Sequence, residues 1–214
     1  KGAFGYSGQK CSATSRVYMH RHIAAEFTEA LVSAVEQLVI DDPRNKKTFI
    51  SPVITEKALT TFRKAVARCR EDGGTILTGG SVLEGGIFSR GYYVRPTVVT
   101  GLPHDHPLVT AELFVPFLIL DTFTMLDEAL DKANATDYGL TAGIFSEAPE
   151  EIEEFFRKIR FGVCYANRQG GATTGAWPGS QSFGGWKASG STGKGVGGPY
   201  YLLSYVHEQA QTRL

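Results

Sequence analysis

A cysteine near the amino terminus is the residue best suited to covalent chemistry. Cys11 lies in the segment GQKCSA, where small residues permit a tight turn and Lys10 places a cation beside the thiol. A nearby cation and exposed backbone N–H groups both favour the thiolate, which is the nucleophilic form. Cys11 is therefore a candidate nucleophile, although an ordinary buried thiol fits the local sequence equally well.

The other cysteines and the histidines are weaker candidates. Cys69 falls on the apolar side of an expected helix and Cys164 within an expected strand, so we predict that both pack as core residues. Four histidines form two polar pairs, His20 with His22 and His104 with His106. We expect these pairs to be solvated and to bind no metal, because no further ligands stand near them. A hydrolase that pairs Cys11 with a histidine stays open as an alternative, since the partners need not be adjacent in sequence.

Glycine is unusually abundant in this chain. It supplies 25 of the 214 residues, about 12 % where about 7 % is usual, and it concentrates in residues 170–198. Such a stretch predicts positive φ angles or close backbone approach, and its length favours a functional role. The GKGVGG stretch within it fits the pattern G-x-G-x-x-G. That stretch follows no expected strand and opens no expected helix, which argues against a dinucleotide fingerprint.

The composition excludes several functional classes. The 22 basic residues balance the 22 acidic ones, and 42 % of the residues are hydrophobic, so the chain can bury a core and is not disordered. A polyanion partner is not indicated, because nucleic-acid binders usually carry a basic excess. No apolar run approaches the roughly 18–20 residues that span a bilayer. Three cysteines favour a reducing compartment, here the cytoplasm or, in a eukaryote, the mitochondrial matrix.

Hydrophobic periodicity predicts the elements that position these residues. Strands are expected at residues 15–20, 75–78, 92–100, 114–120, 140–145 and 162–166, and helices at 23–38, 56–70, 126–133 and 150–159. This alternation predicts an α/β fold of three layers, a largely parallel twisted sheet flanked by helices. The run FVPFLIL predicts a strand buried on both faces. Pro96 lacks an N–H, so its strand is expected at an edge or with a bulge.

Glu112 stands two residues before the buried run FVPFLIL. Ligands of open α/β sheets collect at the ends of strands, which makes Glu112 a candidate binding carboxylate. An exposed loop glutamate with no function is the alternative interpretation.

Four segments, in order, resemble motifs of the aldehyde dehydrogenase superfamily. They are GQKCSATSRVYMH, AELFVPFLIL, NATDYGLTAGIFS, and FGVCYAN followed by SFGGWKASG. Val115 replaces a usual glycine, and Ser182 replaces a usual proline. The resemblance covers nearly the whole chain. GQKCSA, the triplet at 166–168, TGA at 174–176 and the GGPYYL segment further resemble the branch that oxidises glutamate γ-semialdehyde (Δ1-pyrroline-5-carboxylate) to glutamate in proline breakdown.

The resemblance implies a covalent mechanism that uses a nicotinamide cofactor, NAD or NADP. Cys11 would attack the aldehyde to give a thiohemiacetal and, after hydride transfer, a thioester that water cleaves. Glu112 would bind the nicotinamide ribose and Phe114 would pack near the ring. Phe183 would line the aldehyde channel.

The same resemblance implies a site for the substrate α-carboxylate. Ser12 and the backbone of Gly175 and Ala176 would hold it, in keeping with the capacity of glycine-rich turns to bind anions.

The resemblance also implies a division of labour between domains. Residues 1–214 would form the catalytic domain, because the family's NAD-binding domain, general base and oxyanion-hole amide precede the nucleophile. The chain alone is then expected to be inactive, and its C-terminal segment YYLLSYVHEQAQ is expected to supply a strand for a homo-oligomer. The alternatives are an aldehyde dehydrogenase of another substrate class and a non-enzymatic domain used for assembly.

Overall fold

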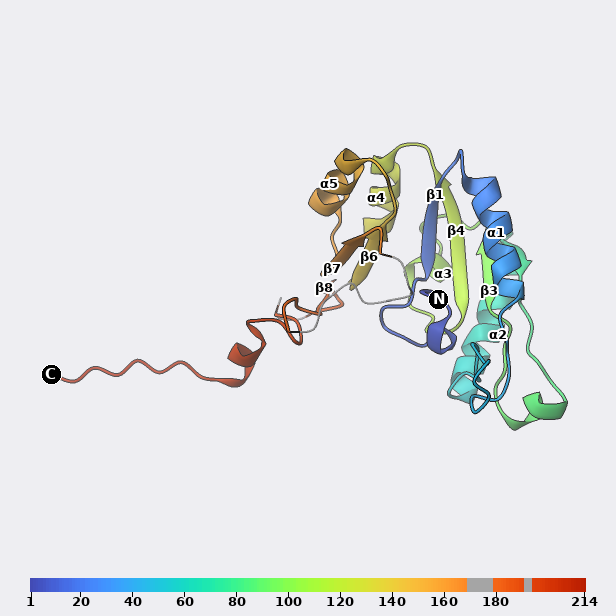
Figure 1. Cartoon of the computed structure of the whole chain (residues 1–214), viewed down its shortest axis with the longest axis horizontal. Coiled ribbons are helices and arrows are strands. Elements are labelled where there is room, and N and C mark those ends of the chain that lie inside the picture. Colours follow the sequence, from blue (N-terminus) through green and yellow to red (C-terminus); the bar gives the residue numbers. More distant parts are fainter. Residues whose placement is uncertain (169–178, 191–193) are drawn as a thin grey trace. The chain divides into compact units, whose positions relative to one another are not determined.

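The computed structural model describes residues 1–168, 179–190 and 194–214. Contacts between residues divide the chain into two compact units (Figure 1). The described part of the N-terminal unit is residues 1–136, and that of the C-terminal unit is residues 137–168, 179–190 and 194–214. None of the helices within the described ranges has the length and apolar character needed to cross a membrane.

The N-terminal unit is a four-stranded sheet with helices on both faces. In chain order its elements are η1 (Gly5–Gly8), β1 (Arg16–His20), α1 (Ala24–Glu36), α2 (Glu56–Glu71), β2 (Thr75–Thr78), η2 (Gly86–Arg90), β3 (Thr97–Thr100), α3 (Pro107–Thr110), β4 (Phe117–Phe123) and α4 (Leu126–Asn134). The strand order is β1-β4-β3-β2. β4 pairs in parallel with β1 and β3, while β2 pairs antiparallel with β3 at one edge.

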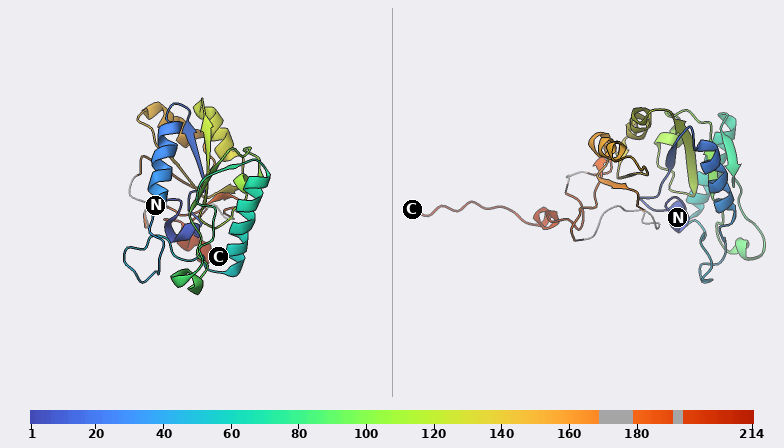
Figure 2. Two further views of the ribbon diagram at one scale, coloured as in Figure 1. Left: turned by 90° about the vertical axis from the view of Figure 1, so that its right-hand side faces the viewer. Right: turned by 45° about the horizontal axis from the view of Figure 1, so that its top comes forward.

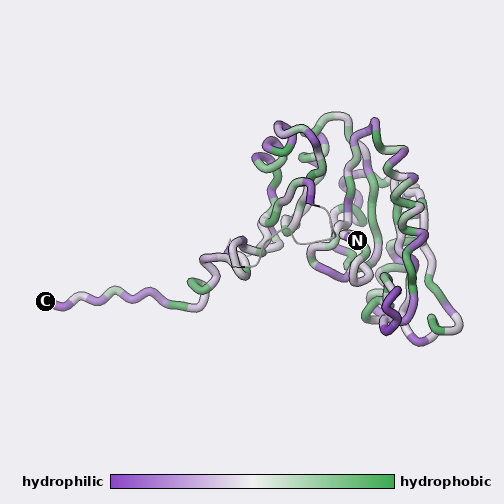
Figure 3. The backbone as a smooth tube through the Cα atoms, viewed as in Figure 1, coloured by the Kyte–Doolittle hydropathy of each residue, from purple (hydrophilic) through white to green (hydrophobic). Residues whose placement is uncertain are grey.

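Strand β4 lies at the centre of this unit, and its first four residues, 117–120, are buried on both faces. It begins three residues later than predicted, because Phe114 has a positive φ and lies outside the strand. Phe117 and Ile119 belong to a buried cluster that includes residues of α2. Leu118 and Leu120 belong to a second cluster, which includes Val35 of α1. Successive side chains of a strand point to opposite faces, so α1 and α2 cover opposite sides of the sheet, as the left view of Figure 2 shows. Figure 3 shows β4 as a hydrophobic run, and the predicted three-layer α/β fold is confirmed.

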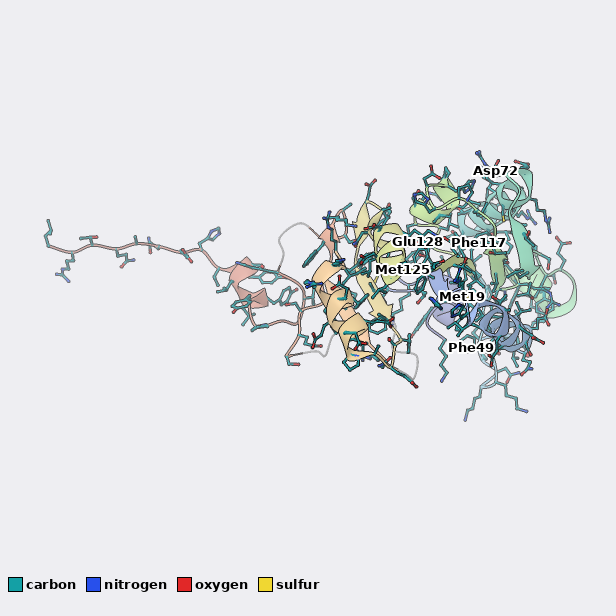
Figure 4. The ribbon with its side chains drawn as sticks, turned by 90° about the horizontal axis from the view of Figure 1, so that it is seen from above. Met19, Phe49, Asp72, Phe117, Met125 and Glu128 are labelled. Atoms are coloured by element: carbon teal, nitrogen blue, oxygen red, sulfur yellow. The ribbon has the colours of Figure 1, made fainter. Side chains whose placement is uncertain are left out.

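The side chains of β1 alternate in the same way. Met19 lies in the cluster on the α1 side (Figure 4). On the other face, Arg16 donates to the carbonyl oxygens of Lys132 and Ala133, and the Tyr18 hydroxyl donates to that of Lys132. These carbonyls belong to the last turn of α4, where a cation is favourable. Burial raises the pKa of Tyr18 above its ordinary value, although the neighbouring Arg16 opposes this shift.

The strand expected around Pro96 was predicted at an edge or with a bulge. The edge position was wrong, whereas the pairing of β3 with β2 does contain a register shift, between Ile76 and Thr78. β3 begins one residue later, at Thr97, and lies between β4 and β2 rather than at an edge. Pro96 therefore needs no N–H for the ladder, and Thr97 donates its own N–H to the Pro116 carbonyl at 2.9 Å. The proline ends an irregular segment instead of interrupting a strand.

Helix α2 follows its sequence signals closely. The Thr55 hydroxyl accepts a hydrogen bond from the Ala58 N–H at the first turn, as an N-cap should. Gly73, with φ of 85°, follows the last turn, and Arg68 and Arg70 lie within that turn. Cys69 is fully buried in the cluster beneath the helix, which confirms its predicted place in the core.

The C-terminal unit contains shorter elements. They are β5 (Tyr138–Gly139), β6 (Thr141–Ile144), α5 (Pro149–Lys158), β7 (Val163–Ala166), β8 (Trp186–Lys187) and η3 (Tyr201–Tyr205). β6 pairs with β7 in parallel, and β5 pairs with β8 antiparallel. Phe155, Ile159, Phe161 and Val163 are its buried apolar residues. The sequence predicted α5, β6 and β7 to within one or two residues at each end.

The glycines of the C-terminal unit permit close contact between backbone segments. A Cβ on Gly162 would overlap the Gly184 carbonyl oxygen, and a Cβ on Gly195 would lie 2.5 Å from the Phe183 carbonyl carbon. Gly179 and Gly197 have φ of 87° and 73°. Both predicted uses of glycine, positive φ and close approach, thus occur among the described residues. Residues 194–198 form no helix, which agrees with the rejection of a dinucleotide fingerprint.

The C-terminal segment forms no strand within the single chain, and its expected pairing with a second copy stays a prediction. Tyr201–Tyr205 is a 3-10 helix, and residues 206–214 have no regular structure. A strand needs a neighbouring strand to satisfy its N–H and C=O groups, and the described part of the unit offers none to these residues. The expected C-terminal strand is therefore not present within the chain itself.

Candidate active site

Cys11 lies in a loop that precedes β1, here named the nucleophile loop (residues 1–15). The Cys11 thiol is exposed, whereas Cys69 is buried and Cys164 is half-buried. Cys11 and Ser12 occupy the centre of a turn that the Ala13 N–H closes on the Lys10 carbonyl at 2.9 Å. The structure thus presents Cys11 to solvent at a tight turn, as its small neighbours predicted.

The two neighbours of Cys11 have contrasting environments. Ser12 is 2 % exposed, which fixes the chain immediately after the thiol. The Lys10 ammonium lies 5.9 Å from the centre of the Tyr6 ring, a cation–π geometry. The predicted cation beside Cys11 is therefore also engaged by an aromatic ring.

Gly8 brings the nucleophile loop against the segment that precedes β4. It has φ of 71°, and a Cβ at this position would lie 2.6 Å from the Val115 carbonyl oxygen and 2.9 Å from Pro116 Cα. Only glycine allows both the left-handed conformation and this approach. The contact sets Cys11, three residues after Gly8, near the segment that carries Glu112 and Phe114.

Glu112 and Phe114 both face solvent. Leu113, between them, packs on the buried cluster beside α2. Phe114 is 43 % exposed and has φ of 56°, an uncommon backbone conformation for an aromatic residue. Among the described residues, none forms a hydrogen bond or ion pair with the Glu112 carboxylate. An exposed carboxylate and an exposed ring therefore stand side by side on an anchored segment.

Cys11, Glu112 and Phe114 lie at the same end of the sheet, in the segments that lead into β1 and β4. β1 and β4 are parallel neighbours, with Arg16 opposite Ile119, and the Ile119 N–H donates to the Ser15 carbonyl at 3.0 Å. Both candidate segments immediately precede these strands, so they meet at the amino-terminal ends of the strands. In Figure 1 the dark-blue nucleophile loop lies beside that end of β1. The sequence predicted a strand end for Glu112 and could not identify which one.

The remaining predicted site residues belong to the C-terminal unit. Phe183 is half-buried, and its backbone pairs with that of Val196 in an isolated antiparallel bridge. Gly175 and Ala176 lie outside the described residues. The predicted roles of these three residues stay predictions.

One histidine prediction was wrong. His106 is only 8 % exposed, and its Nε2 lies 2.8 Å from the Asp72 carboxylate. The His106 Nδ1 accepts a hydrogen bond from the Leu108 N–H at 3.1 Å and so caps α3. Arg68 donates a hydrogen bond to the same Asp72 carboxylate. The hydrogen bonds from Arg68 and, to a smaller extent, from His106 lower the pKa of Asp72 below its ordinary value. The pair fastens α3 to the end of α2 and has a structural role.

Two polar residues of the nucleophile loop, Ser7 and Gln9, were not predicted from the sequence to contribute to the site. The Ser7 hydroxyl donates to the Ser51 carbonyl at 2.6 Å, and the Gln9 side-chain oxygen accepts from the Ile54 N–H at 2.8 Å. Both partners are about 45 positions away in the sequence, so no local pattern reveals these bonds. The position of Gln9 two residues before the candidate nucleophile was the one available signal.

The described residues offer no cluster of three or more histidine, cysteine or acidic side chains that could hold a metal ion. The amino-terminal ends of β1 and β4 instead place an exposed thiol at the same end of the sheet as an exposed carboxylate and an exposed ring.

The profile of the aldehyde dehydrogenase family matches residues 1–210. The chain belongs to the aldehyde dehydrogenase family. It is 36 % identical, over 98 % of its length, to 1-pyrroline-5-carboxylate dehydrogenase 1 of Halalkalibacterium halodurans, of which it covers 39 %. The family fold explains why four sequence motifs far apart along the chain are retained in one order.

Solved structures agree with this assignment. Proline utilization A of Bdellovibrio bacteriovorus, solved after inactivation by N-propargylglycine, superposes with a TM-score of 0.86 at 36 % identity, over 95 % of this chain and 20 % of that one. A variant of betaine aldehyde dehydrogenase from Staphylococcus aureus, solved with NAD+, gives a TM-score of 0.84 at 26 % identity, over 92 % and 39 %. The chain spans about two fifths of the length of the 1-pyrroline-5-carboxylate dehydrogenase of Halalkalibacterium halodurans.

Proposed function

We propose that this chain is the thiol-bearing catalytic part of an aldehyde dehydrogenase that oxidises glutamate γ-semialdehyde to glutamate. The proposal rests on one observation: the loop that carries the exposed Cys11 packs, through Gly8, against the chain that directly follows Glu112 and Phe114. The chain also belongs to the aldehyde dehydrogenase family. The substrate choice is supported by the 36 % identity to a 1-pyrroline-5-carboxylate dehydrogenase.

In the proposed reaction Cys11 is the nucleophile. Its thiolate adds to the aldehyde carbon and forms a C–S bond, while the carbonyl oxygen becomes the oxyanion of a thiohemiacetal. The backbone N–H of Cys11 is available in the turn to stabilise that oxyanion. After the carbon has lost its hydride, water cleaves the resulting thioester, which releases the carboxylate and returns the thiolate.

The exposed pair on the segment before β4 fits a nicotinamide nucleotide. A solvent-facing carboxylate such as Glu112 can accept hydrogen bonds from two ribose hydroxyls, and the exposed Phe114 ring offers an apolar face to a planar ring. When bound, the nicotinamide supplies the acceptor for the hydride. The choice between NAD and NADP is proposed to depend on residues of the NAD-binding domain.

The substrate α-carboxylate is proposed to bind Ser12 and the backbone N–H groups of Gly175 and Ala176, and Phe183 is proposed to line the aldehyde channel. The NAD-binding domain and the general base are proposed to come from further polypeptide, since the chain covers 39 % of its relative. The oligomeric partner is proposed to be a second copy of the same protein. Residues 1–214 alone are therefore expected to form no NADH.

The decisive test is an NADH assay on the protein expressed from its complete reading frame. The unaltered enzyme is expected to prefer an aldehyde that carries an α-amino carboxylate, and Cys11→Ser is expected to lower kcat by at least about 10³-fold, because an alcohol replaces the thiolate. Cys164→Ser is the matched control and should retain activity within about twofold, since a hydroxyl can keep the bond to the Phe161 carbonyl.

Three results would overturn this proposal in part or in whole. Full activity of Cys11→Ser would remove Cys11 as the nucleophile. Equal or better turnover of aldehydes without the α-amino carboxylate would remove the semialdehyde as the substrate and leave an aldehyde dehydrogenase of another substrate class. Absence of aldehyde oxidation by the complete protein would favour a domain used for assembly.

A further inference from the structure

Gln9 connects the nucleophile loop to Ile54, an exposed residue that directly follows the buried Val53 and lies just before α2. Its side-chain oxygen accepts from the Ile54 N–H at 2.8 Å, and its side-chain nitrogen donates to the Tyr6 carbonyl at 3.3 Å. One amide therefore joins two segments that are 45 positions apart in the sequence and also closes the turn that leads to Cys11.

The chain is anchored by buried residues immediately before Ile54. Ile50 is fully buried in the cluster beneath α1, and Val53 is 2 % exposed in the cluster beneath α2. The chain between Ile50 and Val53 thus runs from one buried cluster to the other. The neighbouring Ser51 carbonyl accepts the Ser7 hydroxyl at 2.6 Å, so the loop has two bonds to the same platform.

The loop needs such restraint because its backbone is strained. Tyr6 and Ser7 have φ of 55° and 56°, and the left-handed conformation is unfavourable for residues with a Cβ. Strain of this kind persists only where surrounding contacts determine it. Without those contacts the loop is expected to relax toward ordinary φ values.

Cys11 lies in a short arch between two fixed points. Gln9 is bonded to Ile54 on one side, and Ser12 is 2 % exposed on the other. Only Lys10 and Cys11 lie between them. A shift of the first fixed point therefore moves the thiol directly.

We propose that Gln9 is a positioning residue, which holds the Cys11 thiol for attack through its hydrogen bond to the Ile54 backbone. This inference rests on the proposed function of Cys11. It assigns Gln9 no contact with substrate or cofactor. Misplacement of a reacting group by about 1 Å can reduce a rate by about 10²-fold. Loss of the Gln9–Ile54 hydrogen bond, here called the brace, should therefore lower kcat more than it alters KM.

Three variants test the proposal in the protein expressed from its complete reading frame. Gln9→Ala removes both bonds. Gln9→Glu keeps an oxygen that can accept from the Ile54 N–H. Gln37→Ala is the matched control, since Gln37 is an exposed glutamine at the C-terminal cap of α1 whose side chain donates to the Ser33 hydroxyl.

The kinetic readout is kcat per reactive Cys11, with the reactive fraction measured by titration with iodoacetamide and mass spectrometry. Gln9→Ala is expected to lower this value about tenfold or more with less than about a threefold change in KM. Gln9→Glu is expected to recover it to within about threefold, and Gln37→Ala should match the unaltered enzyme. A merely structural role would reduce the reactive fraction and leave kcat per reactive thiol unchanged, and that result would overturn the proposal.

A second readout does not depend on catalysis. Hydrogen exchange of the Ile54 amide is expected to become about tenfold faster in Gln9→Ala and to stay near the unaltered rate in Gln9→Glu. Unchanged exchange in Gln9→Ala would show that the brace does not hold, whatever the activity. A complete protein that oxidises no aldehyde would remove the proposed function, and with it the positioning role, even if the exchange result supports the brace.

Discussion

The nucleophile loop and the glycine-rich segment (described residues 179–190 and 194–198) contain little regular structure, only η1 and β8 among the described residues, and they are held in place by different contacts. The nucleophile loop is fixed by side chains, since Ser7 and Gln9 bond the backbone of residues 51 and 54. The glycine-rich segment is fixed by the absence of side chains, since its backbone packs directly on the backbone of Gly162 and of its own residues. The first kind of loop should tolerate change at most positions and fail at the polar braces. The second should fail where an added Cβ would meet backbone atoms, as at Gly184, Gly190 and Gly195.

The largest expected effect is that of Gly162→Ala in the C-terminal unit. The new Cβ would overlap the Gly184 carbonyl oxygen, and backbone on both sides leaves nothing flexible to yield. We expect a loss of about 3 kcal/mol in the free energy of unfolding of this unit, measured by hydrogen exchange of the amides of β7. Gly5→Ala is the control, because nothing lies within 4 Å of its Cβ position, and it should change stability by less than about 0.5 kcal/mol. Equal stability of the two variants would contradict the proposed backbone packing.

Gly8→Ala should have the next largest effect and tests whether the comparison is complete. Gly8 is the residue of the nucleophile loop that behaves like the glycine-rich segment, with φ of 71° and a Cβ position 2.6 Å from the Val115 carbonyl oxygen. The added methyl is expected to cost about 2–3 kcal/mol in chemical denaturation, from overpacking together with the left-handed backbone. A cost below about 0.5 kcal/mol would show that the loop can leave the Val115–Pro116 backbone freely.

Ser7→Ala removes a side-chain brace and should cost less. Ser7 is fully buried and its hydroxyl donates to the Ser51 carbonyl at 2.6 Å, so the variant leaves a buried carbonyl without this partner. We expect a loss of about 1–2 kcal/mol in urea denaturation. Ser33→Ala is the control, because Ser33 is exposed on α1 and should contribute within about 0.5 kcal/mol. If both serines gave the same small change, side-chain bracing would not explain how the nucleophile loop is fixed.

The smallest effect concerns the thiols beside the two regions. Burial raises the pKa of Cys164, which precedes the glycine-rich segment, from 9.0 to about 11. A raised pKa in the folded state means that the contribution of Cys164 to stability is complete below pH 9 and is lost as pH rises toward 11. Stability should therefore fall more between pH 9 and 11 in the unaltered chain than in Cys164→Ala. Identical pH dependence of the two proteins would contradict this.

Alkylation provides the accompanying measurement on the same thiols. Exposed Cys11 is expected to react with iodoacetamide at pH 8 at least about ten times faster than half-buried Cys164. Peptide mass spectrometry over time distinguishes the two sites. Faster labelling of Cys164 would contradict the contrast between an accessible loop and a packed strand.

Much of the fold could be predicted because its elements have strong local signals. The run around Leu118 and Ile119 is apolar on both sides of the strand, and α2 has a threonine N-cap and a glycine after its last turn. Pro96 was misjudged because the strand boundary, which decides whether its missing N–H matters, lies one residue later. His106 was misjudged because Asp72, its partner, is 34 positions away.

For the active-site candidates, residue type pointed to Cys11 and Glu112, and family motifs added Ser12, Phe114 and Phe183. The sequence could not show that the segments of Cys11 and Glu112 meet, because that depends on the parallel pairing of β1 with β4.

The sequence by itself determined which candidate site residues are present. They are a cysteine among small residues, an acidic residue before an apolar strand and an excess of glycine. These are properties of residue type and short-range pattern, which the printed order of residues contains in full. Only the tertiary structure decided that the amino-terminal ends of β1 and β4 bring the first two together, and that Gln9 and Ser7 fasten the thiol's loop to residues 51–54. The physical reason is that hydrogen bonds and backbone contacts between distant segments depend on strand order and register, which arise from packing the whole core and not from any one stretch of the chain.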